Sequence, residues 1–127
     1  MKPGRFLVVE DNPLNRRLIR DILRHRGHEV VEAESVDEGR IELRRQAVDV
    51  VLLDIQIPGG GGEQLLRELR GDPAVRHLPV VAVTAFAMRG DRERLLALGF
   101  NGYLSKPIDT RTFGADVERY LERTPGS

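Results

Sequence analysis

The stretch Val50–Leu53 constrains the fold more than any other part of the sequence, because four apolar residues follow one another and lead directly to Asp54. Pro58 and a run of glycines come soon afterwards. A short continuous apolar run that ends at turn residues is typical of a strand buried on both faces of a parallel sheet. Sites of open α/β sheets lie beyond the carboxyl ends of the strands, which is the position of Asp54.

Apolar runs alternate with segments of helical periodicity along the whole chain. Strands are expected at Arg5–Val9, His28–Ala33, Asp49–Leu53, Pro79–Val83 and Asn101–Ser105. Helices are expected from Pro13, capped by Asn12, to a stop at Gly27, then after Ser35, and at about Glu63–Leu69, Met88–Leu98 and Thr110–Glu122. Five strands that alternate with five helices across short loops predict an α/β fold with a doubly wound parallel sheet.

The second helix has the clearest local signal. Ser35 and Glu38 have the spacing of a capping box, in which each residue satisfies a backbone N–H group at the start of a helix. Ile41 and Leu43 are expected on the inner side of this helix.

Size and composition limit the classes of function. The 127 residues are expected to form a single domain, residues 1–127, with a core of about 5–123. Twenty acidic residues balance twenty basic ones, so no basic field indicates binding to nucleic acid or to an anionic membrane. The sequence has no cysteine, which excludes thiol catalysis and thiolate metal sites. No apolar run approaches the length of a membrane span or a signal peptide, so a cytoplasmic domain without membrane insertion is expected.

Polar residues follow four of the expected strands at their carboxyl ends: Glu10, Asp11, Asp54, Thr84 and Lys106. Three carboxylates on neighbouring strands cannot all stay ionised unless cations lie among them, and hard oxygen ligands suit Mg²⁺ or Mn²⁺. An ammonium group and a hydroxyl beside such a metal would neutralise and hydrogen-bond an incoming phosphoryl group. Asp54, in the middle strand, would be the nucleophile that forms an acyl phosphate.

Lys106 also stands out by composition. Eighteen of the twenty basic residues are arginine, and the only other lysine is Lys2. A compact ammonium group fits a crowded site better than the broad planar guanidinium group does.

Four motifs occur in order and at a regular spacing: Val9–Asn12, Leu53–Pro58, Val81–Ala85 and Tyr103–Pro107. Together they resemble the CheY-like receiver domain of bacterial response regulators, and the resemblance covers nearly the whole chain. The longer run Val80–Asp91 looks most like members of the family that stand alone. The resemblance implies a flavodoxin-like sheet of five parallel strands in the order 2-1-3-4-5, with five helices.

The resemblance also implies a phosphoacceptor site. Asp54 would accept a phosphoryl group from a phosphohistidine. Glu10 and Asp11, together with Asp54 and the backbone carbonyl of Gln56, would hold Mg²⁺, or Mn²⁺ in its place. The chain would then be a signalling domain that assists its own phosphoryl transfer and dephosphorylation, and not an enzyme.

A switch is implied by the same resemblance. Thr84 and Lys106 would contact the phosphoryl oxygens, and the peptide bond between Lys106 and Pro107 would be cis. Tyr103 matches an aromatic residue that turns inward when Thr84 moves toward the phosphate. The surface formed by the fourth helix, the fifth strand and the fifth helix would change and be read by a downstream protein.

Partners follow from this interpretation. A histidine kinase or a histidine phosphotransfer protein would dock over the first helix near Leu14, Asn15 and Leu18. No nucleic acid is expected as a partner, and the chain is expected to be a monomer or a weak dimer.

Two features depart from the family pattern. Gly59–Gly62 replaces the usual Met-Asp-Gly ending after Pro58, which predicts a mobile loop and a late start of the next helix. Phe86 and Gln56 occupy the two positions that, by resemblance, control the access of water to the phosphoryl group. We expect a long-lived phosphoryl group.

Alternatives share the fold class. A receiver excised from a hybrid histidine kinase would keep the same chemistry but act as a relay. A phosphohydrolase of the haloacid-dehalogenase type would need a second acid two residues after the nucleophile, where this chain has Gln56. A dinucleotide-binding or flavodoxin-like protein would have a glycine fingerprint after the first strand instead of an acidic pair. His25, His28 and His77 are expected to be solvated, and Arg16–Arg17 is expected on an exposed helix face.

Overall fold

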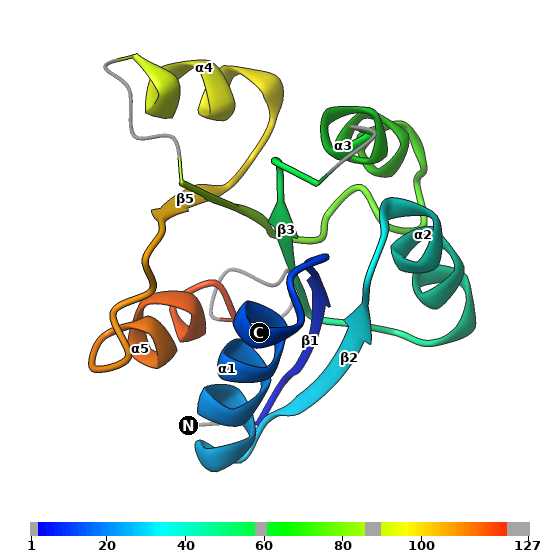
Figure 1. Cartoon of the computed structure of the whole chain (residues 1–127). Helices are drawn as coiled ribbons and strands as arrows, with labels where there is room; N and C mark the ends of the chain where they lie inside the picture. The colour runs from blue at the N-terminus through cyan, green and yellow to red at the C-terminus, as the bar shows by residue number, and fades with distance from the viewer. Residues whose placement is uncertain (1–2, 58–60, 86–89, 122–127) are drawn as a thin grey trace.

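The computed structural model describes residues 3–57, 61–85 and 90–121 of the chain. Its centre is a sheet of five parallel strands in the order β2-β1-β3-β4-β5, as predicted (Figure 1). The strands are β1 (Arg5–Val9), β2 (Glu29–Ala33), β3 (Val50–Asp54), β4 (Val80–Thr84) and β5 (Gly102–Ser105). Their bounds lie within one residue of those expected at either end.

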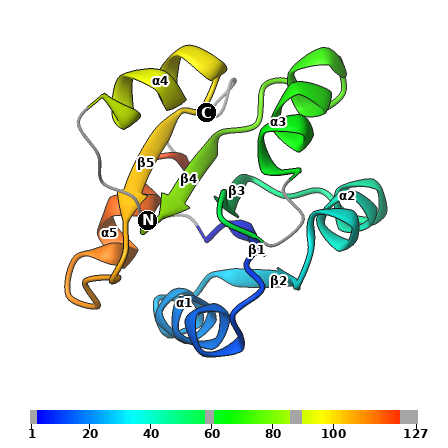
Figure 2. The ribbon, with the colours of Figure 1, turned by 45° about the horizontal axis from the view of Figure 1, so that its top comes forward.

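Five helices cover the two faces of this sheet. They are α1 (Pro13–His25), α2 (Val36–Arg45), α3 (Gly62–Gly71), α4 (Asp91–Leu98) and α5 (Phe113–Glu118). Helices α1 and α5 pack on one face, and α2, α3 and α4 pack on the other (Figures 1 and 2). The architecture is therefore the doubly wound, three-layer fold that the alternating pattern predicts.

The apolar run of β3 explains the layers. Every residue of β3 is buried. Val50 and Leu52 pack with α1 and α5, whereas Val51 and Leu53 pack with the helices of the opposite face. Because successive side chains of a strand point to opposite faces, a strand covered on both sides must be apolar throughout.

The predicted N-caps of the first two helices are confirmed, but the capping box is not complete, because the Glu38 side chain accepts a hydrogen bond from the N–H group of Glu34 instead of that of Ser35. The Asn12 side chain accepts hydrogen bonds from the backbone N–H groups of Leu14 and Asn15. The Ser35 hydroxyl accepts one from the N–H group of Glu38. Such caps satisfy N–H groups that have no partner within the helix.

The last two helices are shorter than predicted. Helix α4 begins at Asp91, after Gly90 in the left-handed conformation (φ 91°), and the expected start at Met88 lies outside the described residues. Helix α5 covers Phe113–Glu118. It starts later than predicted because residues 110–112 form a turn, in which the Asp109 carbonyl accepts hydrogen bonds from the N–H groups of Thr112 and Phe113. Its predicted end at Glu122 lies outside the described residues.

Helix α3 begins at Gly62, one residue before the predicted start at Glu63. Gly61 precedes it with a φ of 94°, a left-handed conformation that glycine adopts without strain. The glycine run therefore includes a position where the backbone needs glycine. The prediction of a mobile loop concerns Gly59 and Gly60, which lie outside the described residues.

The inward orientation predicted for Ile41 is wrong, because its relative exposure is 53%. Two residues apart on a helix, Ile41 and Leu43 are separated by about 200° around the axis and cannot share one face. Leu43 packs against the core together with buried Val36, which lies about two turns earlier on the same side of the helix.

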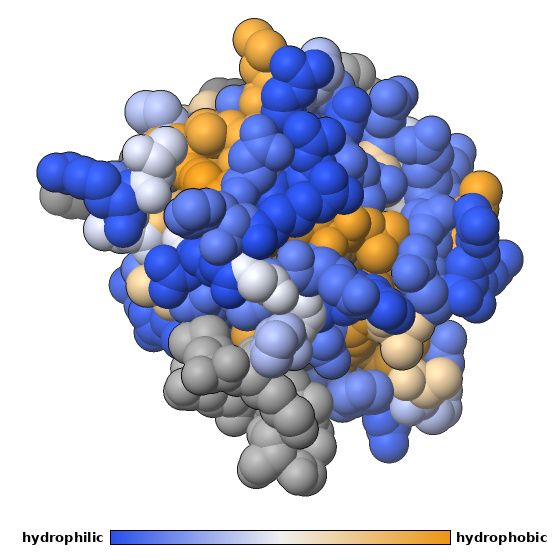
Figure 3. All heavy atoms as spheres, turned by 90° about the horizontal axis from the view of Figure 1, so that it is seen from below, coloured by the Kyte–Doolittle hydropathy of each residue, from blue (hydrophilic) through white to orange (hydrophobic). Residues whose placement is uncertain are grey.

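One face of the molecule is mostly hydrophilic (Figure 3). On the face shown in Figure 3, apolar side chains form separate patches among polar and charged ones. In the parts of the chain that the structure describes, no helix is both long and apolar enough to cross a membrane.

Arg70 at the end of α3 joins three segments of the chain. Its guanidinium group donates hydrogen bonds to the carbonyl oxygens of Gly99, Arg76 and Leu78 and to Oδ1 of Asn101, at 2.6–3.1 Å. Burial lowers the pKa of Arg70 from its usual value. This single side chain therefore satisfies carbonyl groups before β4 and before β5.

We predict that Arg70→Met lowers the free energy of unfolding by roughly 2 kcal/mol, because several partly buried carbonyl groups lose their donor at once. Chemical denaturation measures the loss. Arg67→Met, on the exposed side of the same helix, is the matched control and should change stability by about 0.5 kcal/mol or less. Equal effects of the two substitutions would contradict the role of Arg70.

The prediction that His28 is solvated is wrong. Its side chain is 1% exposed and stacks edge-on against Phe6. Nδ1 accepts a hydrogen bond from the Gly4 N–H group (3.0 Å), and Nε2 lies 2.7 Å from Oε2 of Glu118, which also accepts from Arg26. With Nδ1 acting as an acceptor, the proton of the neutral ring is on Nε2 and is donated to Glu118.

This network predicts the acid stability of the fold. Hydrogen bonds from Arg26 hold the pKa of Glu118 at about 2 despite its burial, and His28 acts in the same direction. A lowered pKa means that the carboxylate stabilises the fold above its ordinary pKa of 4.5, and that this contribution is lost as the pH falls toward 2. Glu118→Gln should therefore be less stable than the wild type at pH 7, and the difference should shrink below pH 4.5.

Denaturant midpoints at several pH values measure this difference. Glu93→Gln, an exposed position in α4, is the control and should follow the wild type at every pH. If the difference in stability between Glu118→Gln and the wild type does not change with pH down to pH 2, the ionised Glu118 carboxylate does not stabilise the fold.

Candidate functional site

The strand order brings the predicted site residues to one edge of the sheet. The chain leaves β1 toward β2 on one side and returns to β3 on the other, so the order reverses between β1 and β3. In such sheets a crevice opens at the carboxyl ends of the strands at this reversal. Glu10 follows β1 and Asp54 ends β3 at this place, while Thr84 ends β4 and Lys106 follows β5.

Lys106 connects the two buried carboxylates. Its Nζ lies 3.0 Å from Oδ2 of Asp54 and 2.8 Å from Oε1 of Glu10. The side chains of Asp54 and Glu10 are 3% and 2% exposed, and that of Lys106 is 15% exposed. Buried charges are costly unless they are paired, so this ammonium group is needed where the two acids meet.

One ammonium group does not fully compensate the two acids. Burial raises the pKa of Glu10 to about 7, the hydrogen bond with the Asp54 side chain raises it too, and Lys106 opposes the shift. Apart from its ion pair with Lys106, the buried Oε1 of Glu10 has no hydrogen-bond partner among the residues that the structure describes. A buried carboxylate oxygen in this state is suited to a cation.

Asp11 completes a group that fits a divalent metal ion. Within the described parts of the chain, one carboxylate oxygen each from Glu10, Asp11 and Asp54 lie within 4.8 Å of one another. Asp11 is exposed at the rim, whereas the other two are buried. Three oxygen ligands with one side open to water suit Mg²⁺, which usually keeps several of its waters.

Gln56 contacts the site from the loop after β3. Its backbone N–H group donates a hydrogen bond to Oδ1 of Asp54 (2.8 Å), which helps to orient the carboxylate. Its side-chain Oε1 accepts a hydrogen bond from the N–H group of Ala85 (2.6 Å), just after β4. The sequence predicts a role for the Gln56 carbonyl, but no local pattern predicts that its side chain spans the two loops.

Thr84 ends β4, the strand next to that of Asp54, and Tyr103 lies on β5, one strand further from Asp54. Thr84 is fully buried, and its carbonyl accepts a hydrogen bond from the N–H group of Lys106 (2.8 Å). The peptide bond between Lys106 and Pro107 is cis, as predicted. Tyr103 is half-buried and packs against the core cluster beneath α2, α3 and α4. Phe86 lies outside the described residues.

A groove with a volume of about 490 Å³ lies over β5 between α4 and α5. Arg92 and Leu96 line it from α4, Tyr103 from β5, and Asp116 and Tyr120 from the C-terminal segment. Tyr103 therefore connects the sheet beside the site with an outer surface of the molecule.

Comparison with known proteins agrees with this geometry. Residues 6–118 match the family described as the response regulator receiver domain. The chain is 40% identical over 119 residues to the polar-differentiation response regulator DivK of Brucella anthropi, covering 94% of this chain and 97% of that protein. The run Val80–Asp91 indicates a likeness to DivK from the sequence, and that prediction is confirmed.

Solved structures show the same fold. The chemotaxis response regulator CheY4 of Vibrio cholerae superposes with a TM-score of 0.86 at 22% identity, over 94% of this chain and 99% of that one. The receiver domain of a sensor histidine kinase from Pseudomonas aeruginosa, solved with a magnesium ion in its active site cleft, gives a TM-score of 0.79 at 35% identity, over 99% of this chain and all of that one. The chain thus belongs to the response regulator receiver domains, the signalling modules of two-component systems.

Proposed function

We propose that Asp54 is the phosphoacceptor, that Glu10, Asp11, Asp54 and the backbone carbonyl of Gln56 hold Mg²⁺, and that the phosphoryl donor is a phosphohistidine. The observation that carries this proposal is the position of Lys106 Nζ, 3.0 Å from Asp54 Oδ2 and 2.8 Å from Glu10 Oε1. Both carboxylates belong to the acidic cluster that Asp11 completes. The magnesium ion in the Pseudomonas receiver domain supports the choice of metal. Mn²⁺ is a second candidate on the grounds of its oxygen preference.

The chemistry is a phosphoryl transfer between two side chains. A carboxylate oxygen of Asp54 forms a bond to phosphorus, while the bond from phosphorus to the imidazole nitrogen of the donor breaks and the imidazole keeps the electron pair. When bound, Mg²⁺ would neutralise the charge of the phosphoryl oxygens. Lys106 adds a second positive charge within reach of Asp54, and the N–H group of Gln56 holds the carboxylate in one orientation.

The acyl phosphate would then act as a switch. Thr84 and Lys106 would exchange their present partners for phosphoryl oxygens, and Tyr103 would turn inward beside them. The groove between α4 and α5 contains Tyr103, so its shape would change with phosphorylation. Many signalling proteins work in this way: a local change of charge shifts the balance between two stable arrangements of a structural element. A downstream protein would read this surface.

The histidine kinase or phosphotransfer protein would dock over α1, where Leu14 is 73% exposed close to the site. Residues 1–127 would act as one receiver domain, in the cytoplasm, as a monomer or a weak dimer. The acyl phosphate would be hydrolysed with the assistance of the same site.

Incubation with acetyl phosphate tests the phosphoacceptor. Intact-mass measurement should show one added phosphoryl group in the wild type, and only when Mg²⁺ is present. Asp54→Asn should gain none, because an amide oxygen is a poor nucleophile and does not form the acyl phosphate. Asp21→Asn, an exposed position on α1, is the matched control and should be labelled like the wild type.

An Asp54→Asn protein that is still labelled would contradict the assignment of the phosphoacceptor. Absence of any adduct in the wild type would require a titration with beryllofluoride. A bound beryllofluoride would then indicate rapid hydrolysis, and no binding would contradict the proposed function.

We predict that the wild type keeps its phosphoryl group for a long time and that Gln56→Ala shortens this lifetime several-fold. The reason is that the Gln56 side chain bridges the loops after β3 and β4 through Ala85 and narrows the path of water to Asp54. Loss of the label after removal of acetyl phosphate measures the lifetime. Gln64→Ala, exposed on α3, should leave the lifetime unchanged. An unchanged or longer lifetime in Gln56→Ala would contradict this role.

A further inference from the structure

Arg16 on α1 is not the exposed residue that its sequence context predicts. Its side chain is only 13% exposed. Nη1 donates a hydrogen bond to the backbone carbonyl of Glu10 (2.9 Å), Nε lies 3.3 Å from Oε1 of Glu32, and Nη2 lies 3.4 Å from Oε1 of Glu34. One guanidinium group thus joins the end of β1 to β2 and to the residue after it.

The carbonyl that Arg16 holds belongs to the peptide group between Glu10 and Asp11. Glu10 has further ties, because its N–H group donates to the carbonyl of Ala33 (3.0 Å) and its Oε2 accepts from the N–H group of Asn12 (3.2 Å). Among the described residues, no hydrogen bond or ion pair is formed by the side chain of Asp11. The direction of this exposed carboxylate therefore depends on the peptide group that precedes it.

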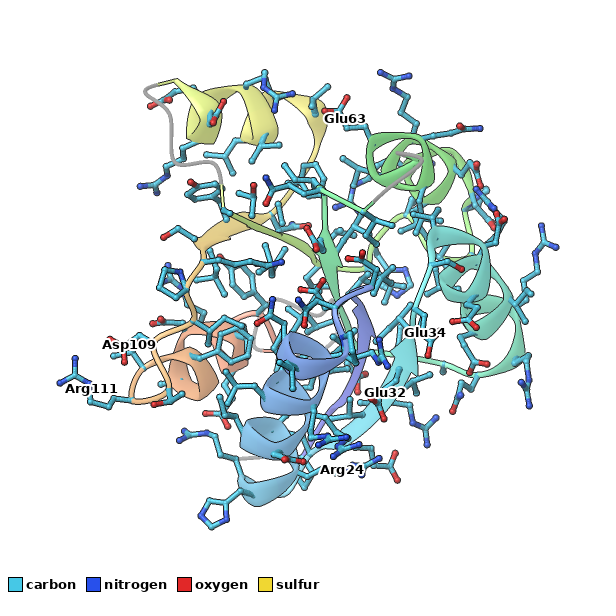
Figure 4. All side chains as sticks on the ribbon, in the orientation of Figure 1. Arg24, Glu32, Glu34, Glu63, Asp109 and Arg111 are labelled. Atoms are coloured by element: carbon cyan, nitrogen blue, oxygen red, sulfur yellow. The ribbon has the colours of Figure 1, made fainter. Side chains whose placement is uncertain are left out.

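Through its charge alone, Arg16 would weaken the binding of a metal ion. A positive charge near three carboxylates repels a divalent cation. Glu32 and Glu34 offset this charge; Figure 4 shows both residues along β2 beside α1. Arg20, one turn further along α1, shares Glu32 at 3.6 Å, and Glu10 is not among its hydrogen-bond partners. The two arginines thus have similar charge environments and differ in their contact with the metal-binding strand end.

We infer that Arg16 is a positioning residue for the metal site: it fixes the Glu10–Asp11 peptide group and thereby aims the Asp11 carboxylate at the ion. This inference rests on the proposed magnesium site. Loss of an outer group that orients a metal ligand typically weakens metal binding about tenfold to a hundredfold. Loss of the charge alone would strengthen binding, so the two explanations predict changes of opposite sign.

Calorimetric titration of the unphosphorylated protein with MgCl₂ tests the inference. Arg16→Gln should bind Mg²⁺ about tenfold more weakly than the wild type. Arg20→Gln removes the same charge from the same helix and should bind as tightly as the wild type or slightly more tightly. An Arg16→Gln affinity equal to or above that of the wild type would overturn the inference.

Arg16→Lys provides a second variant that keeps the positive charge and the apolar stem. A single ammonium group cannot reach the carbonyl and both carboxylates in the same geometry, so weaker Mg²⁺ binding is expected here as well. Thermal unfolding without metal shows whether each variant is folded. If Arg16→Gln does not fold, the Arg16→Lys titration decides, and wild-type affinity in that variant would overturn the inference.

Labelling by acetyl phosphate separates positioning from a general structural role. In Arg16→Gln, the Mg²⁺ concentration for half-maximal labelling should rise about tenfold, while the maximal rate at saturating Mg²⁺ should stay close to that of the wild type. A lower maximal rate with unchanged Mg²⁺ dependence would overturn the inference. A wild type that binds no Mg²⁺ would instead contradict the proposed metal site, so the two failures are distinguishable.

Discussion

The burial of two carboxylates side by side is the constraint on which the rest of the site depends. Glu10 follows β1 and Asp54 ends the neighbouring strand β3, so the strand order forces the two buried side chains close together. Lys106 lies between them from β5, and Asp11 adds a third acid at the rim. This excess of negative charge at one edge of the sheet is unfavourable without a cation, so the fold itself favours the magnesium binding that we propose.

The sequence predicts those features that depend on local pattern. The uninterrupted apolar run of β3 identifies a strand covered on both sides, and Asn12 and Ser35 identify two helix starts. The strand-end residues converge because parallel strands align their carboxyl ends, so Asp54 and Lys106 could be placed together without coordinates. The prediction for Ile41 is wrong because residues two apart on a helix point to nearly opposite sides, so Ile41 and Leu43 cannot both face the core.

Contacts between distant segments could not be predicted. The Gln56 side chain contacts Ala85, and Arg16 contacts the carbonyl of Glu10. Both contacts depend on how the loops, helices and strands pack in three dimensions. An arginine beside acids in a helix has the same sequence pattern whether it is solvated or nearly buried. The residues that surround the site can therefore be identified only from the tertiary structure, whereas its reactive groups can be identified from their positions at the strand ends.

His28 shows what burial does to a side chain that is chemically versatile in water. Both ring nitrogens are engaged, one as an acceptor from Gly4 and the other as a donor to Glu118, and the ring is closed off from solvent. No lone pair remains on it to take up a phosphoryl group or a metal ion. In a chain for which we propose phosphoryl transfer from an imidazole to a carboxylate, this imidazole has only a structural role and holds α5 against the sheet.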